Sequence, residues 1–132
     1  KLWLHWIQQD GSPHLLRNEC WRYVALINSS HYFAILDNVM GKTMPISFLS
    51  IFNQNGVVYN VSIIKYREQY GGQIKSKRWL EKFKNYTDTS DYTIGKNISA
   101  ISGATISVHS ISKGIHKLTL IINDIIKTFN EK

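Results

Sequence analysis

The sequence predicts a single α+β domain, with an antiparallel sheet of about four strands packed against a long C-terminal helix and one or two short helices. Three observations predict this class. Alternating apolar residues separated by turn signals fill the first half of the chain. Apolar residues recur every three or four positions near its end. The length of 132 residues fits one ordinary domain.

The first third of the chain predicts a short amphipathic segment followed by a hairpin. Trp3 and Trp6 lie at helical spacing before a run of turn residues. Trp21–Ile27 and His31–Leu36 are rich in aromatic and β-branched residues, and a polar tripeptide separates them. This pattern is typical of two strands joined by a turn.

The middle of the chain predicts a second hairpin. The segment Asp37–Lys42 has little apolar content and reads as a connection, whereas Ile46–Phe52 alternates as a strand does. Asn55-Gly56 supplies the residue types that tolerate positive φ in a tight turn. Beyond it, Val57–Ile64 alternates with period two, which predicts a strand with one buried face.

The rest of the chain predicts helices joined by a loop. Within Lys75–Lys84, apolar residues three and four positions apart lie among cations, which predicts a basic amphipathic helix. Asn85–Gly95 is polar and reads as a loop. After Thr105 the apolar residues follow helical steps as far as Phe129, which predicts the long terminal helix.

Composition narrows the classes of function. Sixteen Lys and Arg against nine Asp and Glu give a net charge of +7, which favours nucleic acid, a phosphate-bearing cofactor or a membrane surface as the anionic partner. Cys20 is the only cysteine, so internal disulfides and a paired-cysteine metal or redox site are excluded. The apolar runs are shorter than the roughly 20 residues that span a bilayer.

The most informative stretch is Ser102-Gly103-Ala104-Thr105, followed by Ile106 and Ser107, at the predicted start of the long helix. Small residues let a ligand approach the backbone, and the amides of a first helical turn have no partner within the helix. These features predict an anion site there, with hydroxyls near a phosphate. An ordinary N-cap by Ser or Thr is the alternative.

This stretch resembles the flavinylation motif of the FMN-binding domain family, which includes the C subunit of the sodium-pumping NADH:quinone oxidoreductase and the G subunit of the Rnf complex. Three further segments match in the family's order: Gly41–Pro45, the turn Asn55–Val58, and the loop Tyr66–Gly72. The resemblance covers roughly Tyr32 to the end of the terminal helix and leaves the first thirty residues of the single domain unexplained.

The resemblance implies FMN as the cofactor, a phosphoester between FMN and Thr105, and a separate flavin transferase that makes this bond from FAD. The chain departs from the family pattern at Ser99, where the family usually has Asp. No catalytic residue and no metal site are expected. The expected cofactor-binding residues are Met44, Pro45, Glu68, Gly71, Ser102, Gly103, Ala104, Thr105, Ile106 and Ser107.

The resemblance also implies an electron carrier that works with a redox partner protein, rather than an enzyme with its own substrate. We expect an extracytoplasmic protein that reaches a membrane only through a segment missing from this sequence. The basic segment Lys65–Lys84 is either a solvated face or a docking surface for an acidic partner. We interpret His109 and His116 as surface histidines rather than metal ligands.

Two other functions stay open. The first is a flavin-free binding or assembly domain of the same fold. The second is a basic nucleic-acid-binding module, although the chain contains no recognisable DNA or RNA motif and no nucleic-acid partner is expected.

Overall fold

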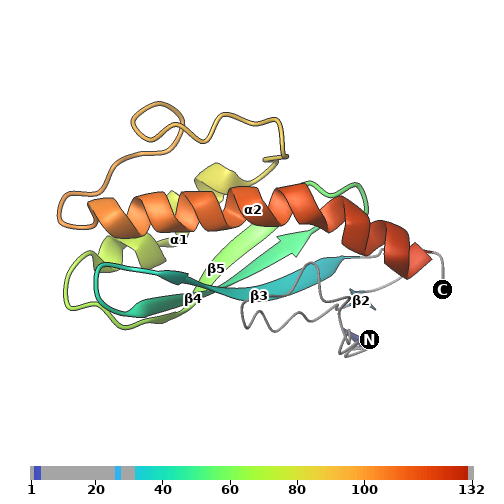
Figure 1. Ribbon diagram of the computed structural model, residues 1–132, viewed down its shortest axis with the longest axis horizontal. Helices are drawn as coiled ribbons and strands as arrows, with labels where there is room; N and C mark the ends of the chain where they lie inside the picture. The colour runs from blue at the N-terminus through green and yellow to red at the C-terminus, as the bar shows by residue number, and fades with distance from the viewer. Residues whose placement is uncertain (1, 4–25, 28–31, 131–132) are drawn as a thin grey trace.

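The computed structural model describes residues 2–3, 26–27 and 32–130 (Figure 1). Three antiparallel strands, β3 (Phe33–Met40), β4 (Pro45–Phe52) and β5 (Val58–Tyr66), form the main sheet in the order β3-β4-β5. The long helix α2 (Thr105–Asn130) lies across one face of this sheet (Figure 1). The prediction of an α+β fold is confirmed.

The strands pair differently from the prediction at the N-terminal end. β1 (Leu2–Trp3) and β2 (Leu26–Ile27) pair with each other in a separate two-stranded sheet. The predicted hairpin between β2 and the strand after it is therefore wrong, because the described residues of β2 and β3 belong to different sheets. The other residues of the predicted N-terminal elements lie outside the described residues.

β3 continues through a polar stretch that was expected to be a connection. Asp37 is buried within the strand, and it is tolerated there because Lys117 on α2 lies 2.8 Å from its carboxylate. The Asn38 amide also donates to this carboxylate at 2.8 Å. Eight residue pairs thus join β3 to β4, and only a short turn connects them.

β4 follows its prediction, with four alternate side chains buried: Ile46, Phe48, Ser50 and Phe52. The turn after it is longer than expected. Five residues separate β4 from β5. The Asn53 side chain holds this turn by accepting hydrogen bonds from the amides of Asn55 and Val57 at 2.9 and 3.1 Å. Gly56 takes a positive φ of 79°, whereas Asn55 does not.

β5 departs from strict alternation because its pairing with β4 slips twice. Ile51 pairs with Asn60 but Phe52 pairs with Val58, which leaves Tyr59 as an extra residue. A second slip between Ser47 and Phe48 leaves Ile64 extra in the same way. Each of these bulges turns the following side chains to the other face. Val58 and Val61, three apart, are consequently both buried.

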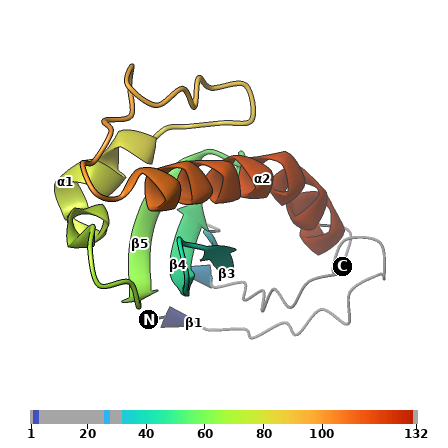
Figure 2. The same cartoon turned by 60° about the vertical axis from the view of Figure 1, so that its left-hand side comes forward.

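The predicted basic helix is broken into three short pieces. These are the 3-10 helix η1 (Gly72–Lys75), α1 (Lys77–Leu80) and the 3-10 helix η2 (Glu81–Phe83), which lie beside β5 (Figure 2). Ser76 interrupts the run because its side chain caps α1 by accepting from the Trp79 amide at 3.1 Å. The predicted apolar face is confirmed, because Trp79, Leu80 and Phe83 are buried, and Ile74, just before the predicted helix, is buried as well.

α2 supplies the other half of the core, as its period predicts. Its buried apolar side chains are Val108, Ile111, Ile115, Leu118, Ile122, Ile125 and Ile126. Gly114 allows the helix to approach the sheet closely, because a Cβ there would lie 2.6 Å from Val39 Cγ1 and 3.0 Å from Phe48 Cζ. Among the residues that the structure describes, no helix combines the length and apolarity needed to cross a membrane.

Candidate functional site

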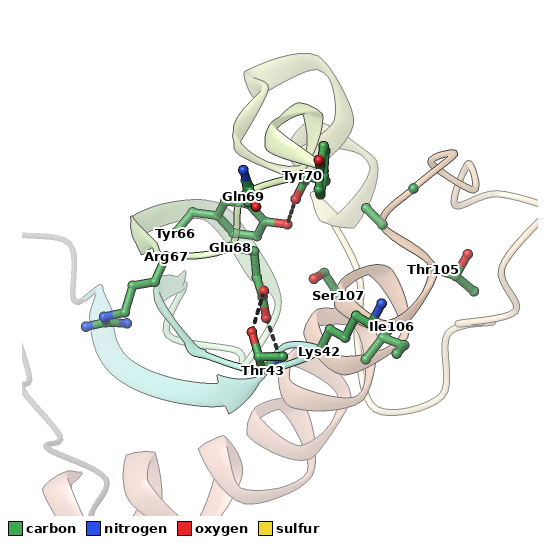
Figure 3. Close-up of a pocket in the computed structure, with 12 residues that line it drawn as sticks. Lys42, Thr43, Tyr66, Arg67, Glu68, Gln69, Tyr70, Thr105, Ile106 and Ser107 are labelled. Carbon is green, nitrogen blue, oxygen red and sulfur yellow. Dashed lines mark hydrogen bonds between the residues drawn. The ribbon is translucent and has the colours of Figure 1, made fainter.

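An open pocket of about 580 Å³ lies where the start of α2 meets two turns of the sheet (Figure 3). This volume is within the range of about 300–1,000 Å³ that small-molecule sites occupy. Three segments far apart in the sequence line it: Lys42 and Thr43, then Tyr66, Arg67, Glu68, Gln69 and Tyr70, and finally Gly103, Ala104, Thr105, Ile106 and Ser107.

Glu68 fixes one wall of the pocket by holding the turn between β3 and β4. Its Oε1 accepts from the Thr43 amide at 2.7 Å, and its Oε2 accepts from the Thr43 hydroxyl at 3.0 Å (Figure 3). Oε1 also accepts from the Met44 amide at 3.0 Å. The Thr43 amide, followed by that of Met44, lowers the pKa of Glu68. Gly41 makes this approach possible, because a Cβ there would lie 2.6 Å from Glu68 Oε1.

Gly71 brings the loop after β5 against the start of α2. Its φ of 83° is in the left-handed region, where glycine carries no steric penalty. A Cβ at this position would lie 2.5 Å from Ala104 Cβ and 2.8 Å from the Tyr66 hydroxyl. The Tyr66 hydroxyl donates to the carbonyl of Tyr70 and thereby closes the loop on itself. Only glycine at position 71 allows the loop and the helix to touch.

The start of α2 has no side-chain cap. Val108 donates to the Ala104 carbonyl at 2.9 Å, which makes Ala104 the N-cap residue, and alanine cannot accept a hydrogen bond from the first turn. The amides of Thr105, Ile106 and Ser107 have no partner within the helix. The alternative of an ordinary Ser or Thr cap is therefore wrong, and three amides with the positive end of the helix dipole are available to an anion.

Ser107 places a hydroxyl beside these amides. The residue is only 3% exposed, and it lines the pocket. Figure 3 shows it pointing toward Glu68, whereas Thr105 points away from that wall. A hydroxyl can donate a hydrogen bond to an anion, so Ser107 is a candidate donor to a ligand in the pocket.

The pocket carries more positive than negative charge. Lys42 lies beside Ile106 in Figure 3, and the Arg67 guanidinium donates to the Pro45 carbonyl at 2.7 Å. Glu68 contributes the only carboxylate among the lining residues, and its oxygens accept from the neighbouring turn. The arrangement fits a ligand that consists of an anionic group attached to a larger group.

Six of the ten predicted site residues line this one pocket: Glu68, Gly103, Ala104, Thr105, Ile106 and Ser107. The other four lie close to it. Gly71 packs behind Ala104, Met44 donates its amide to Glu68, Pro45 accepts from Arg67, and Ser102 is exposed just before the helix.

Sequence reasoning missed the other lining residues, which are Lys42, Thr43, Tyr66, Arg67, Gln69 and Tyr70. All of them lie within the matched segments Gly41–Pro45 and Tyr66–Gly72. Their place beside the predicted residues is the one signal that identifies them.

The structure also bears on metal binding. Among the described residues, no three His, Cys, Asp or Glu side chains come close enough to hold an ion. His109 is exposed as expected, but His116 is not a simple surface residue. Its ring stacks on Tyr92 with 4.3 Å between centroids, and its Nε2 lies 3.1 Å from the Asp88 carbonyl, so it holds the loop over α2.

Comparison with known proteins connects this pocket to a family. Residues 41–119 match the family model described as the FMN-binding domain, and this match includes every residue that lines the pocket. No curated protein matches the chain. The matched region exceeds half of the chain, and it runs from the turn that Glu68 holds to the middle of α2. The chain therefore belongs to the FMN-binding domain family, and FMN is its cofactor.

Proposed function

We propose that this domain is an electron carrier that holds FMN in the pocket, with the FMN phosphate at the start of α2. The observation that carries the proposal is the alanine at the N-cap, which leaves the amides of the first turn of α2 without a side-chain cap beside the pocket. FMN supplies reversible electron transfer at its ring when it is bound, and the protein binds it, orients it and limits its contact with water.

The phosphate position is supported by charge and by hydrogen-bonding capacity. A negative group at a helix N-terminus gains about 0.3–1 kcal/mol from the dipole in exposed settings. Lys42 adds a cation on the same side of the pocket (Figure 3). The Ser107 hydroxyl lines the same pocket and is a candidate donor to a phosphate oxygen.

A carrier role, rather than catalysis on a separate substrate, is supported by what lines the pocket. Glu68 accepts three hydrogen bonds, and its lowered pKa keeps it ionised at neutral pH, so it is a poor proton donor. The Tyr66 hydroxyl is already bonded to the Tyr70 carbonyl. These two groups are engaged in building the pocket walls and are not available for acid–base chemistry.

We propose in addition that FMN is attached covalently at Thr105. Thr105 is exposed, and its hydroxyl makes no hydrogen bond with the described residues. A flavin transferase would join Thr105 Oγ1 to the FMN phosphate, break the pyrophosphate of FAD and release AMP. Ser99, which replaces the family's usual Asp, is exposed, and its carbonyl accepts from the Trp79 indole at 2.8 Å.

Intact mass after co-expression with an active flavin transferase tests the attachment. We expect a mass increase of one FMN less one water, and no increase for Thr105→Ala. An unmodified wild-type chain would refute the phosphoester while leaving reversible binding to be measured by titration. In that titration Ser107→Ala should weaken FMN binding about 2- to 12-fold, which corresponds to the loss of one hydrogen bond of roughly 0.5–1.5 kcal/mol.

A further inference from the structure

We infer that the exposed cations beside the pocket form a docking surface for the acidic face of an electron-carrier protein. This inference rests on the proposed function and names the kind of partner. The basic surface is defined here by five exposed residues of η1, α1, η2 and the position after them: Lys75, Lys77, Arg78, Lys82 and Lys84.

Most of the protein's net charge is concentrated around this surface. The 20 residues Lys65–Lys84 hold seven of the sixteen Lys and Arg but only two of the nine carboxylates, so they carry +5 of the total +7. One of these carboxylates, Glu68, is used by the turn at the pocket. The other, Glu81, lies 4.0 Å from Lys77 with both side chains exposed, an arrangement that neutralises little.

The basic surface is fixed close to the pocket. η1 begins directly after the loop that lines the pocket, and Gly71 holds this loop against Ala104. Trp79 of α1 ties the segment to the residues leading into α2, because its indole donates to the Ser99 carbonyl at 2.8 Å. Both cartoon views place α1 beside the first turns of α2 (Figures 1 and 2). A partner on the cations would therefore lie next to the cofactor.

The pocket mouth supplies the apolar contacts that protein interfaces use. Tyr70 is 72% exposed and Ile106 is 50% exposed, and both line the pocket. Interfaces between proteins are enriched in aromatic residues at their centre and are charged at their rim. The combination of an exposed aromatic and aliphatic pair with cations to one side has this anatomy.

The same observations favour a protein over a membrane or a nucleic acid. Segments that bind at a bilayer surface insert Trp, Phe or Leu side chains. Here Trp79, Leu80 and Phe83 are all buried in the core, so the short helices that carry the cations offer no large apolar side chain for insertion. Stacking on successive bases needs several free rings. The ring of Tyr59 is already covered by Lys84, whose Nζ lies 5.7 Å from its centroid. An acidic protein surface can bind these cations through ion pairs alone.

Binding to plant-type ferredoxin, a strongly acidic electron carrier, tests the docking surface. The dissociation constant is measured for the FMN-loaded domain at about 20 mM and about 300 mM salt. The distance over which charges interact differs several-fold between these two salt concentrations. Lys77→Glu/Arg78→Glu should weaken binding at least tenfold at low salt. The matched variant Lys113→Glu/Lys127→Glu reverses two exposed cations of α2 and should change binding less than threefold. High salt should remove the difference between the two variants.

Three results would overturn the inference. The first is no ferredoxin binding at low salt, and the second is equal weakening by both double variants. The third is that Lys77→Glu/Arg78→Glu weakens binding to phosphatidylglycerol vesicles or to single-stranded DNA but not to ferredoxin. Reduction of FMN by photoreduced ferredoxin is followed separately. Salt-sensitive binding without electron transfer would support the docking surface and refute the carrier function. Electron transfer from ferredoxin to FMN that neither double variant changes would support the carrier function and refute the docking surface.

Discussion

Lys117 on α2 and Asp37 on β3 form an ion pair of 2.8 Å across the interface between helix and sheet. The Asp37 side chain is 1% exposed and that of Lys117 is 50% exposed, so a buried carboxylate is neutralised by a cation at the surface. The Lys117 ammonium thus supplies the opposite charge that a buried carboxylate needs. The pair fixes where α2 lies along β3.

Removal of the lysine should therefore destabilise the fold. Lys117→Met keeps the aliphatic stem but leaves the Asp37 carboxylate with less compensation, and we expect a loss of about 1–3 kcal/mol in unfolding free energy. Urea denaturation measures it. Because the two residues interact directly, Asp37→Asn should cost less in the Lys117→Met background than in the wild type. Equal costs in both backgrounds would contradict a direct interaction.

Gly114→Ala tests how tightly α2 packs on the sheet. Alanine gains about 1 kcal/mol of helix propensity over glycine. Its Cβ would, however, lie 2.6 Å from Val39 Cγ1 on a paired strand and close to the buried ring of Phe48. Overpacking costs roughly 1–3 kcal/mol, so we expect a net decrease in thermal stability. Lys113→Ala, at the exposed neighbouring position, should leave the melting temperature nearly unchanged.

Glu68→Gln should make the stability of the turn between β3 and β4 insensitive to acid. The amide of Thr43 and then that of Met44 lower the pKa of Glu68, so folding favours the carboxylate. This contribution is fully present above the ordinary glutamate pKa of 4.5, and it is lost as pH falls through the lowered value.

The check is the difference in melting temperature between wild type and Glu68→Gln, measured from pH 7 to pH 3. We expect the wild type to melt higher at neutral pH and the difference to shrink below pH 4.5. Glu81→Gln, which alters an exposed carboxylate, is the control. A difference that stays constant over the whole range would contradict the role of the ionised group.

Gly71→Ala should separate the loop of the pocket from α2. The new methyl group would overlap Ala104 Cβ, and the φ of 83° would be strained for alanine. We expect lower stability together with weaker FMN retention, measured by flavin fluorescence after gel filtration. Gly95→Ala is the matched control, because its φ of 97° is equally unfavourable while its Cβ meets nothing within 4 Å. Equal loss of flavin in both variants would show that strain alone, and not the contact with Ala104, is responsible.

Ala104→Ser is expected to change stability and FMN affinity in opposite directions. A serine at the N-cap accepts from the free amides of the first turn, which stabilises helices by about 0.5–2 kcal/mol relative to alanine. The same amides are then less available to the phosphate. A flavin-free protein that melts higher but binds FMN more weakly is the expected result. FMN binding that Ala104→Ser leaves unchanged would place the phosphate elsewhere.

Regular periodicity is what made parts of the fold predictable. α2 and β4 repeat their apolar residues with the period of their own element, and both were predicted correctly. The course of β5 was not, because the bulges at Tyr59 and Ile64 arise from pairing with β4 and leave no local signal. The continuation of β3 through Asp37 likewise depends on Lys117, eighty residues further along the chain.

The site residues were likewise predicted only where they carry a local signal. The stretch from Gly103 to Ser107 carries its own signal, since small and hydroxyl residues at a helix start point to an anion. Glu68 was expected near a ligand, but its bonds to the opposite turn are visible only in three dimensions. Tyr70 and Lys42 reach the pocket because the chain folds back, and no local pattern marks them.

The three segments that line the pocket come from residues 42–43, 66–70 and 103–107, and the last of these is the first turn of a 26-residue helix. During synthesis the two turns of the sheet emerge early, but the third wall is held in place only when α2 has packed along the strands. The pocket is therefore complete only when residues far apart in the chain have packed together. A fragment that ends before residue 103 would lack one of its three walls.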